Sequence, residues 1–554
     1  MTFLSGTLHL LACAHWLKRS LLKPCGAQCE RGAVWRLLML ELFRATGSMG
    51  DNESKQYSIT ASVRRLAALI RASMSFARLT KSSRSMESPQ AAIMVPEKQN
   101  QSQRTELYQL IQGGQFWTTD DNTLLRTIQA EFPAELDRLK RATFLRSTSV
   151  GTPAEPSISE RLYGHDYAEI NRTLVGVLAL RWLWHNQYET FVGSQSPSAI
   201  VLRRKSFTWL RQLFCDGLKS PDDIYTLVVS MITNDLGKDP RLAQDYADLK
   251  GIDISKVNHD MILYHAVEAN MVPALNRLTR ENRENILIGI KLGSDFNFGQ
   301  LAQGENAPAS LAGLLEMENH PRAFEMRFME QVLDVSGAAG HEDWTCAKKM
   351  TEPIFQSYQN VYDVANTIIS KKVSLREGYD IILIRKLDLL LQTGYHRRLN
   401  IHDSSDRALM RLFCLGNTSS PQDADVYYDA FMNGISLEIR RCLVRGLNQD
   451  GTINEPAVQP TYLPAILTKA AGNTPSGSQA EKVRAISAVL RYLSRCLVVE
   501  ASSIEKLPRG VTVIERDVRK ITQVLDSKEF SHHPEVLDNE TIPEDQVANM
   551  APGY

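Results

Sequence analysis

An acid and an amine lie close together at the end of an apolar segment of this sequence. Residues 227–232 are almost entirely hydrophobic, and they lead directly into TNDLGKDP at residues 233–240. This motif carries Asp235 and Lys238 on what must be a turn. A carboxylate and an amine held there could bind a polar substrate or take part in catalysis. The structural alternative is that Gly237 ends the preceding helix and that an aspartate caps it.

The same motif resembles the HD-x-G-K signature of HD-type metal-dependent phosphohydrolases, with Asn234 in the place of the histidine. In such a site, histidine and aspartate hold a divalent metal that activates water. Further along, Asn258, His259, Asp260 and His265 could supply more ligands. Asparagine is a weak ligand for a transition metal, whereas imidazole is a good one. We therefore expect no cofactor and no metal ligands under the main interpretation, and a divalent metal only under the phosphohydrolase alternative.

A second polar stretch, residues 293–306, gathers amides and carboxylates among apolar residues. It contains Asp295, Asn297, Gln300, Gln303, Glu305 and Asn306. Gln300 and Gln303 are three residues apart and would share one face of a helix. So many hydrogen-bonding groups beside apolar residues indicate a substrate-binding pocket. A polar loop that only caps helices is the alternative.

Two further segments carry groups that could do chemistry. At residues 334–344, small residues precede His341, Glu342 and Asp343, so the turn could supply a general base or a cation-binding pocket. It could equally be a turn with a solvated acidic cluster. At residues 203–214, basic residues alternate with aromatic ones, a pattern that can bind nucleic-acid phosphates and stack bases. Its basic residues are Arg203, Arg204, Lys205 and Arg211. The alternative is an amphipathic helix with a solvated basic face.

Helices must position nearly all of these groups. Apolar residues at helical spacing predict one long helix over residues 159–191 and another over 197–214, with Ser196 as a possible N-cap. Further helices are expected over residues 258–270 and 280–292. Ser220 is the expected cap of the helix that ends near Thr233. Only residues 510–514 alternate as a strand does. We therefore predict an all-α fold with a single large helical domain over residues 97–528 and a disordered acidic tail over residues 529–554.

The charge distribution and the cysteines of the sequence indicate which classes of protein it fits. The chain has 554 residues, 43% of them hydrophobic, and no formal net charge. Residues 1–96 hold 13 Lys and Arg against 5 Asp and Glu, whereas the remainder holds 50 against 58. The body as a whole is thus no polyanion-binding surface, although local basic patches remain possible. Eight cysteines without a zinc-finger pattern indicate reduced thiols in a cytoplasmic protein.

The basic leader, residues 1–96, fits no ordinary domain. Three interpretations are open: a misassigned start or retained intron, with Met86 as the natural start; a targeting segment; or a genuine helical extension. Its apolar run, residues 3–17, is too short to span a bilayer. We expect no membrane partner, and a cytoplasmic location with N-terminal targeting left open.

Taken together, the body resembles a group of orphan fungal proteins of specialised metabolism. The resemblance is carried by NDLGKDP (234–240), NHD (258–260), NFGQLAQGEN (297–306) and AAGHEDW (338–344). Within that group, the arginine-containing cyclodipeptide synthases are the best named candidate. Such an enzyme takes arginyl-tRNA and a second aminoacyl-tRNA and forms a diketopiperazine.

The resemblance implies roles for particular residues. A pocket for the guanidinium group needs carboxylates, because paired carboxylates select arginine. The candidates are Asp235, Asp260, Asp295, Glu305 and Asp343. His259 or His341 would accept the proton of the attacking amine, and Arg203, Arg204, Lys205 and Arg211 would bind the tRNA. A non-catalytic helical scaffold remains a third interpretation, which predicts that the polar clusters are dispersed. The oligomeric state is left open.

Overall fold

The computed structural model describes residues 105–142, 156–197, 200–499 and 507–550. Residues 98–554 form one compact unit. The predicted basic leader, residues 1–96, lies outside the described residues. Within the described ranges, no helix combines the length and the apolar character that crossing a membrane would require.

Two helices form the centre of the first half of this unit. Most residues of α8 (Ala168–Trp184) are buried, as expected for a helix that is apolar on nearly all sides. α16 (Pro321–Gly337) packs along it. The contact is close because Gly337 lacks a side chain: a Cβ there would lie 2.0 Å from the carbonyl oxygen of Arg172. The charged residues at the start of α8 are thereby held against the end of α16.

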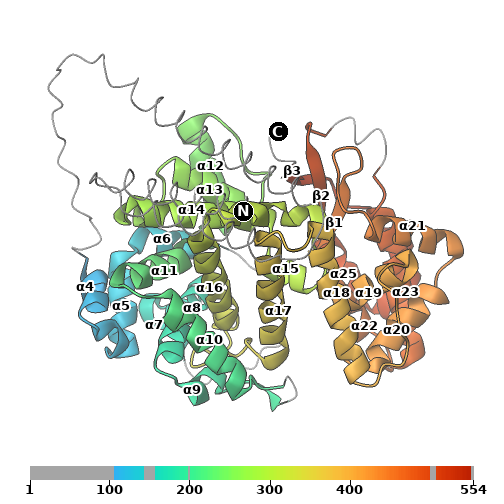
Figure 1. The fold of residues 1–554 in the computed structure, drawn as a ribbon, viewed down its shortest axis with the longest axis horizontal. Helices are drawn as coiled ribbons and strands as arrows, with labels where there is room; N and C mark the ends of the chain where they lie inside the picture. The colour runs from blue at the N-terminus through green and yellow to red at the C-terminus, as the bar shows by residue number, and fades with distance from the viewer. Residues whose placement is uncertain (1–104, 143–155, 198–199, 500–506, 551–554) are drawn as a thin grey trace, which may run out of the picture. The chain divides into compact units, whose positions relative to one another are not determined.

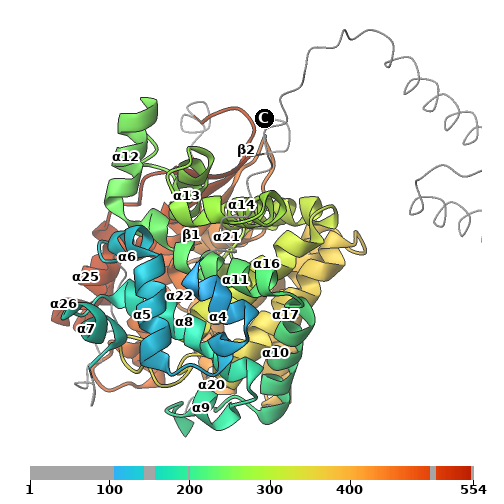
Figure 2. The ribbon, with the colours of Figure 1, turned by 90° about the vertical axis from the view of Figure 1, so that its left-hand side faces the viewer.

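The other elements of the first half surround this pair. These elements include α4 (Glu106–Gln112), η2 (Gln115–Trp117), α5 (Asp121–Glu131), α6 (Pro133–Leu139), α7 (Ile158–Tyr163), α9 (Tyr188–Val192), α10 (Arg204–Gly217), α11 (Pro221–Thr233) and α17 (Glu352–Ile369). Between α11 and α16 the chain forms η4 (Leu236–Lys238), α12 (Pro240–Lys250), α13 (His259–Glu268), η5 (Pro273–Arg277), α14 (Arg280–Asp295), α15 (Phe298–Ala302) and η6 (Pro308–Glu318). Figures 1 and 2 show α12, α13 and α14 as a layer above α8.

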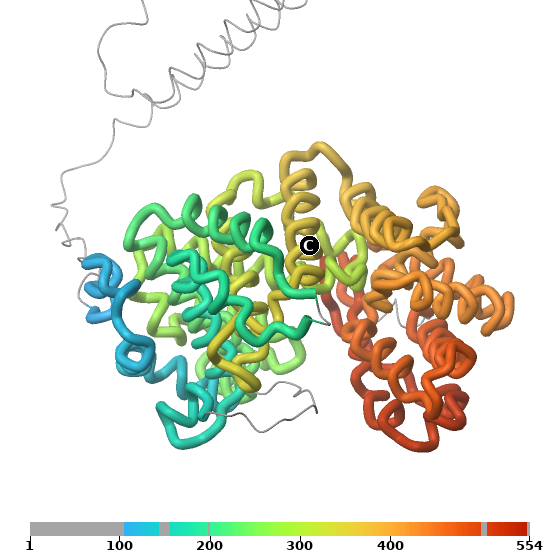
Figure 3. Tube along the Cα trace, turned by 90° about the horizontal axis from the view of Figure 1, so that it is seen from below, coloured from blue at the N-terminus to red at the C-terminus, as the bar shows by residue number. Residues whose placement is uncertain are grey.

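The second half gathers on one side of the unit, as the orange and red tube in Figure 3 shows. It consists of α18 (Leu375–Gln392), α19 (Ser404–Leu415), α20 (Pro421–Met432), α21 (Leu437–Leu447), α22 (Leu463–Gly472), α23 (Gln479–Cys496), η7 (Val518–Ile521), α25 (Thr522–Leu525), α26 (Lys528–His532) and η8 (Pro534–Asn539).

A small sheet joins the two halves. Its strands are β1 (Ala457–Thr461), β2 (Val511–Asp517) and β3 (Gln546–Met550), in the order β1-β2-β3. β1 and β2 are parallel, with Ala457 opposite Val513 and Thr461 opposite Asp517, while β2 and β3 are antiparallel. β2 and β3 also contact η6 of the first half. The ends of β1 and β2 therefore lie near residues of both halves.

The predicted helical fold is confirmed, because helices dominate the described residues. The single helix predicted over residues 159–191 is wrong: the chain breaks it into α7, α8 and α9, with Gly164 (φ 74°) and Asn186 (φ 57°) in the left-handed region. The helix predicted over residues 197–214 begins only at Arg204. The disordered tail predicted over residues 529–554 is also wrong up to Met550, because α26, η8 and β3 occupy it.

Candidate active site

The turn after α11 lies directly against the start of α13. Gly237 makes this possible, since a Cβ there would lie 1.8 Å from the carbonyl oxygen of His259. Any other residue would push the two segments apart. The contact brings Asp235 and Lys238 next to His259 and Asp260. Gly237 thus permits a close approach, and the alternative in which it ends α11 is wrong, because the helix closes at Asn234 in the right-handed region.

Charged side chains from four segments meet at this contact: α8, the turn with η4, α13 and α16. Lys238 Nζ lies 2.9 Å from Asp235 Oδ2 and 3.1 Å from Glu169 Oε1. Arg172 NH1 also reaches Glu169 Oε1, at 3.1 Å, and its NH2 lies 3.3 Å from Asp334 Oδ1. We call the following residues the charged cluster: Glu169, Arg172, Asp235, Lys238, His259, Asp260, Arg327, Glu330 and Asp334.

Arg327 forms the buried side of the charged cluster. Its guanidinium donates to Asn234 Oδ1 at 2.7 Å, to Glu330 Oε1 at 2.6 Å and to Asp260 Oδ2 at 3.3 Å. The side chains of Arg327, Glu330 and Asp260 are 4%, 2% and 6% exposed. Asn234 therefore accepts a hydrogen bond from a fixed cation.

The charged cluster can hold a proton near neutral pH. Burial, together with the neighbouring Asp235 carboxylate, raises the pKa of Glu169 to about 7. Burial acts the same way on Asp235, but the charges of Lys238 and Arg172 outweigh it and keep the pKa of Asp235 below its usual range. Glu169 thus keeps its proton to a higher pH than Asp235 does, and the two carboxyls of the charged cluster differ in charge near neutral pH.

The exposed fractions of the side chains indicate which group of the charged cluster a substrate would contact first. The side chain of His259 is 45% exposed and that of Lys238 is 19% exposed, whereas Asp235 is 7% and Glu169 is 0% exposed. His259 Nε2 lies 3.8 Å from Asp260 Oδ1. A substrate would therefore contact His259 first, with Lys238 beside it and the carboxylates behind.

The second half of the chain adds groups to this edge. Tyr462, between β1 and α22, is 40% exposed and has φ 70°, a strained conformation for a non-glycine residue. The Arg519 guanidinium lies 4.0 Å from the centre of its ring. Glu515 accepts a hydrogen bond from Thr461 Oγ1 at 2.5 Å. Burial raises the pKa of Glu515, and the charge of His259 acts against this, so Glu515 lies within electrostatic range of His259.

Gln459 is the centre of a second group, the amide cluster of Gln300, Glu305, Asn306, Ser310 and Gln459. Gln459 Nε2 donates to Gln300 Oε1 at 3.2 Å, and its Oε1 accepts from Asn306 and Ser310 at 3.1 Å each. Glu305 Oε1 accepts from the backbone N–H of Leu463 at 3.2 Å. Glu305 thus fixes the start of α22, directly after Tyr462.

We predict that Glu305 makes the protein less stable as pH rises. Burial raises the pKa of Glu305 from its ordinary value of 4.5 to about 8. Between these values the unfolded chain loses this proton and the folded chain keeps it, so the free energy of unfolding falls by up to about 1.4 kcal/mol per pH unit. Glu305→Gln keeps an acceptor for Leu463 and does not titrate.

Urea unfolding of the wild type and of Glu305→Gln at pH 5, 6, 7 and 8 measures this contribution. The difference between their free energies of unfolding should shift in favour of the variant as pH rises. If the free energy of unfolding changed with pH by the same amount in the wild type and in Glu305→Gln, the prediction would be contradicted.

Other predicted site residues lie apart from both clusters. Asp343 accepts from Ser194 Oγ at 2.5 Å and from Thr345 Oγ1 at 2.6 Å. His341 Nε2 is 3.7 Å from Glu342 Oε1. Asp295 is the last residue of α14, and burial raises its pKa to about 6. The hydrogen bonds described for Asp343 and Asp295 are made with residues outside the charged cluster.

The remaining predicted residues serve local structure or the surface. Asn297 Oδ1 caps α15 by accepting from the N–H of Gln300 at 3.1 Å, and Gln303 closes the same helix. On α10, Arg204 pairs with Glu189 at 2.5 Å, and Arg203 lies 3.9 Å from Glu352. Lys205 and Arg211 lie on the same helix, with Lys205 exposed and Arg211 half-buried. In Figures 1 and 2, α10 lies well below α13.

The pattern of the sequence did not identify Arg327, Glu330, Tyr462 and Glu515 as site residues. A signal existed for the first two: they are three residues apart inside the otherwise apolar stretch of α16, where unpaired charges would be costly. No such signal marks Tyr462, because its backbone angle is visible only in three dimensions.

Neither metal ligands nor surface hollows define the site. In the ranges that the structure describes, no group of three or more His, Cys, Asp or Glu side chains could hold a metal ion. A pocket of about 800 Å³ is lined by Arg495, Arg516 and Glu540, and one of about 400 Å³ by Glu131 and Arg277. Both lie away from the charged cluster. We place the site by its converging titratable groups, because those two pockets gather no comparable set.

The fold and the charged cluster together define a helical protein whose buried ionic network reaches the surface at a histidine. The chain belongs to a family of unknown function (DUF6829), whose model matches residues 125–537. This range contains every residue of both clusters, as well as Tyr462 and Glu515. No curated protein and no solved structure matches the chain.

Proposed function

We propose that this chain is a tRNA-dependent cyclodipeptide synthase that joins arginine to a second amino acid, as the resemblance of its sequence to fungal enzymes of specialised metabolism implies. The observation that carries the proposal is the convergence of His259, Lys238 and Asp235 at Gly237, on the accessible edge of a buried network. Diketopiperazine formation needs a base for an amine and a cation for a developing oxyanion, and this edge offers both.

The reaction consists of two ester aminolyses. The imidazole of His259 accepts a proton as the α-amine of one aminoacyl-tRNA attacks the ester carbonyl of the other. Lys238 faces the negative charge that develops on the carbonyl oxygen. The C–O bond breaks, and the leaving ribose hydroxyl takes the proton back. The same steps at the second ester close the ring. In total, two ester bonds are replaced by two amide bonds, and two tRNAs are released.

The arginine side chain would lie against Tyr462 and Glu515. A guanidinium binds well where an aromatic face and a carboxylate occur together. The ring of Tyr462 already carries one guanidinium, that of Arg519, at 4.0 Å. This supports a role for the ring in recognising a planar cation. Glu515 is half-buried, which strengthens its attraction for a charged group.

The proposal is tested with the full-length chain and purified arginyl-tRNA carrying labelled arginine, mixed with a second set of charged tRNAs. Mass spectrometry should find a labelled arginine-containing diketopiperazine. The Asp235→Asn variant, which keeps the shape of the side chain, should lose it. Arginyl-tRNA that is left intact, or that is hydrolysed to free arginine without a cyclic product, would contradict the proposed function.

A further inference from the structure

The helix α21 presents three arginines, Arg440, Arg441 and Arg445, without carboxylate partners. Arg441 and Arg445 are exposed, and Arg440 is half-buried, with its NH1 donating to the carbonyl oxygen of Met432 at 2.9 Å. Among the described residues, no Asp or Glu forms an ion pair with any of the three. Glu438 lies on the same helix and makes no ion pair with them. Two exposed apolar side chains, Leu437 and Met432, lie next to them.

These arginines differ from the basic residues that the sequence pattern selected. On α10, Arg204 is neutralised by Glu189 and also lies over the ring of Tyr188, at 4.3 Å. The body around α21 carries an excess of acidic residues, since residues 97–554 hold 50 Lys and Arg against 58 Asp and Glu. In a chain segment with an excess of acidic residues, these arginines form a local positive patch that would attract a polyanion.

The surface beside the three arginines is hollowed and firmly supported. One pocket of about 400 Å³ is lined by Arg440, Arg441 and Arg445 with Leu437 and Met432. A second pocket of about 380 Å³ shares Arg445 with it. This second pocket is also lined by Asn448 and by two carboxylates, Asp450, which pairs with Arg376, and Glu455, so the phosphate-binding side is the first pocket. The two pockets therefore meet along the C-terminal half of α21.

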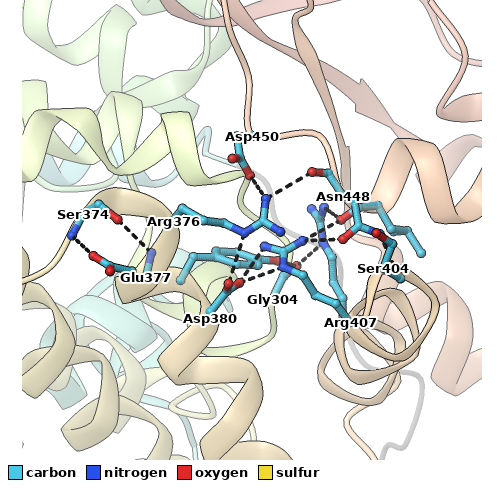
Figure 4. A network of polar contacts seen from close by, with 12 residues as sticks. Gly304, Ser374, Arg376, Glu377, Asp380, Ser404, Arg407, Asn448 and Asp450 are labelled. Atoms are coloured by element: carbon cyan, nitrogen blue, oxygen red, sulfur yellow. Dashed lines mark hydrogen bonds and ion pairs between the residues drawn. The ribbon is translucent and has the colours of Figure 1, made fainter. Parts of the chain in front are cut away.

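The network in Figure 4 includes Ser404, Asn448 and Asp450, which line the second pocket. Asn448 Nδ2 donates to the carbonyl oxygen of Ser404 at 2.8 Å, which ties the end of α21 to the start of α19. Arg407 holds Asn448 Oδ1 at 3.2 Å and pairs with Asp380 at 2.7 Å. Arg376 also contacts Asp380, at 3.1 Å. Such a braced surface needs little ordering when a ligand binds.

We propose that the arginine face of α21 binds the phosphate backbone of RNA, and that it holds the body of the aminoacyl-tRNA whose ester end reacts at His259. This second part rests on the proposed function. Guanidinium groups pair with phosphates in a bidentate manner and stack on bases, which favours arginine over lysine at RNA. The exposed Leu437 and Met432 offer apolar contact to bases or ribose.

A membrane fits this helix less well than RNA does. An interfacial helix must turn its apolar face outward. The apolar residues Leu443 and Leu447 of α21 are buried, and Gly446 packs against Leu497, where a Cβ would lie 2.6 Å from the Leu497 Cβ. The apolar face is thus already used within the protein.

The test measures RNA binding without any reaction. Fluorescently labelled, uncharged tRNA is titrated with the full-length wild type and with the double variant Arg441→Ala/Arg445→Ala, at several salt concentrations. Loss of two phosphate contacts should weaken binding about tenfold or more near 0.1 M salt. It should also lower the slope of log affinity against log salt by about 1.5. A matched double variant at two exposed lysines elsewhere, Lys372→Ala/Lys528→Ala, should bind as the wild type does.

Equal affinity and equal slope for the wild type and the α21 variant would overturn the inference. So would binding to phosphatidylserine vesicles in place of tRNA. The two proposals fail separately. Weakened tRNA binding by the variant, together with no diketopiperazine from the wild type, would keep the RNA surface and overturn the synthase. Diketopiperazine formation by the wild type, together with unchanged tRNA binding by the α21 variant, would keep the synthase and overturn the RNA surface.

Discussion

Replacing His259 with glutamine should lower the rate of diketopiperazine formation by about 10²–10⁴-fold, the range that loss of a general base produces. Glutamine is polar and similar in size, so the contact between Gly237 and the backbone at position 259 remains. What is lost is a group that can take a proton. The loss should appear in kcat, because the proposed arginine-binding groups, Tyr462 and Glu515, are unchanged in this variant.

The control for this experiment lies on the same helix. His265 is six residues further along α13, where its ring packs 5.7 Å from that of Tyr246 and takes no part in the charged cluster. His265→Gln should therefore keep the rate within about twofold of the wild type, as is usual for a change away from the reacting groups. Both variants are first compared by thermal unfolding. A folded His259→Gln variant with a wild-type rate would exclude this residue as the base.

The sequence predicts the helices that carry the site, because each has a regular apolar face and a recognisable beginning. Ser220 was expected to cap the helix that ends near Thr233, and its side chain accepts from the N–H of Asp223 in α11. The helix expected over residues 258–270 is α13 (His259–Glu268). Apolar periodicity cannot locate a break, however, when apolar residues continue on both sides of it. For this reason α7, α8 and α9 looked like one helix.

The tail shows the opposite error. Its acidic residues and prolines are typical of disorder, yet β3 pairs with β2, for example through Val547 opposite Ile514. The hydrogen bonds that order this segment come from a strand more than thirty residues earlier in the chain. Local composition carries no information about such a partner.

The site was predictable where its residues are neighbours in sequence. Asp235 and Lys238 share one short turn, and His259 and Asp260 are adjacent, so motifs revealed them. Their convergence depends on Gly237, whose role is a contact with a distant backbone. Glu305 was expected in a pocket and does lie in a polar cluster, but His341 and Asp343 were expected beside the same site and are held by other contacts.

Replacing Arg411 with methionine should destabilise the protein by about 2–5 kcal/mol, because each buried carbonyl oxygen left without a donor costs about 1–3 kcal/mol. Arg411 is 1% exposed and donates to two segments at once, the loop of residues 304–306 and the end of α21. Its Nε and NH2 bond to the carbonyl oxygens of Gly304 and Asn306, at 3.0 Å each, and its NH1 bonds to that of Leu447, also at 3.0 Å. Methionine fills similar space but donates no hydrogen bond, so the carbonyl oxygens of Glu305 and Asn306 lose their donor. Those of Gly304 and Leu447 keep a second donor, from Tyr379 and Arg407.

Arg376 supplies the comparison, since it belongs to the adjoining network in Figure 4 and its side chain is 35% exposed. Water can replace its contacts with Asp380 and Asp450, so Arg376→Met should cost about 1 kcal/mol or less. Urea unfolding of the two variants measures both effects. Equal losses would mean that the carbonyl contacts of Arg411 contribute no more than a surface ion pair.

The Arg411→Met substitution also tests how the loop that carries Glu305 supports Tyr462. Arg411 holds the loop that carries Glu305, and Glu305 holds the backbone of Leu463 next to Tyr462. A folded fraction of Arg411→Met should therefore retain the groups around His259 and lose the fixed position of Tyr462. We expect the KM for arginyl-tRNA to rise more than kcat falls, because recognition of the guanidinium is disturbed while the base is intact. A fall in kcat alone would place the contribution of this loop in the chemical step.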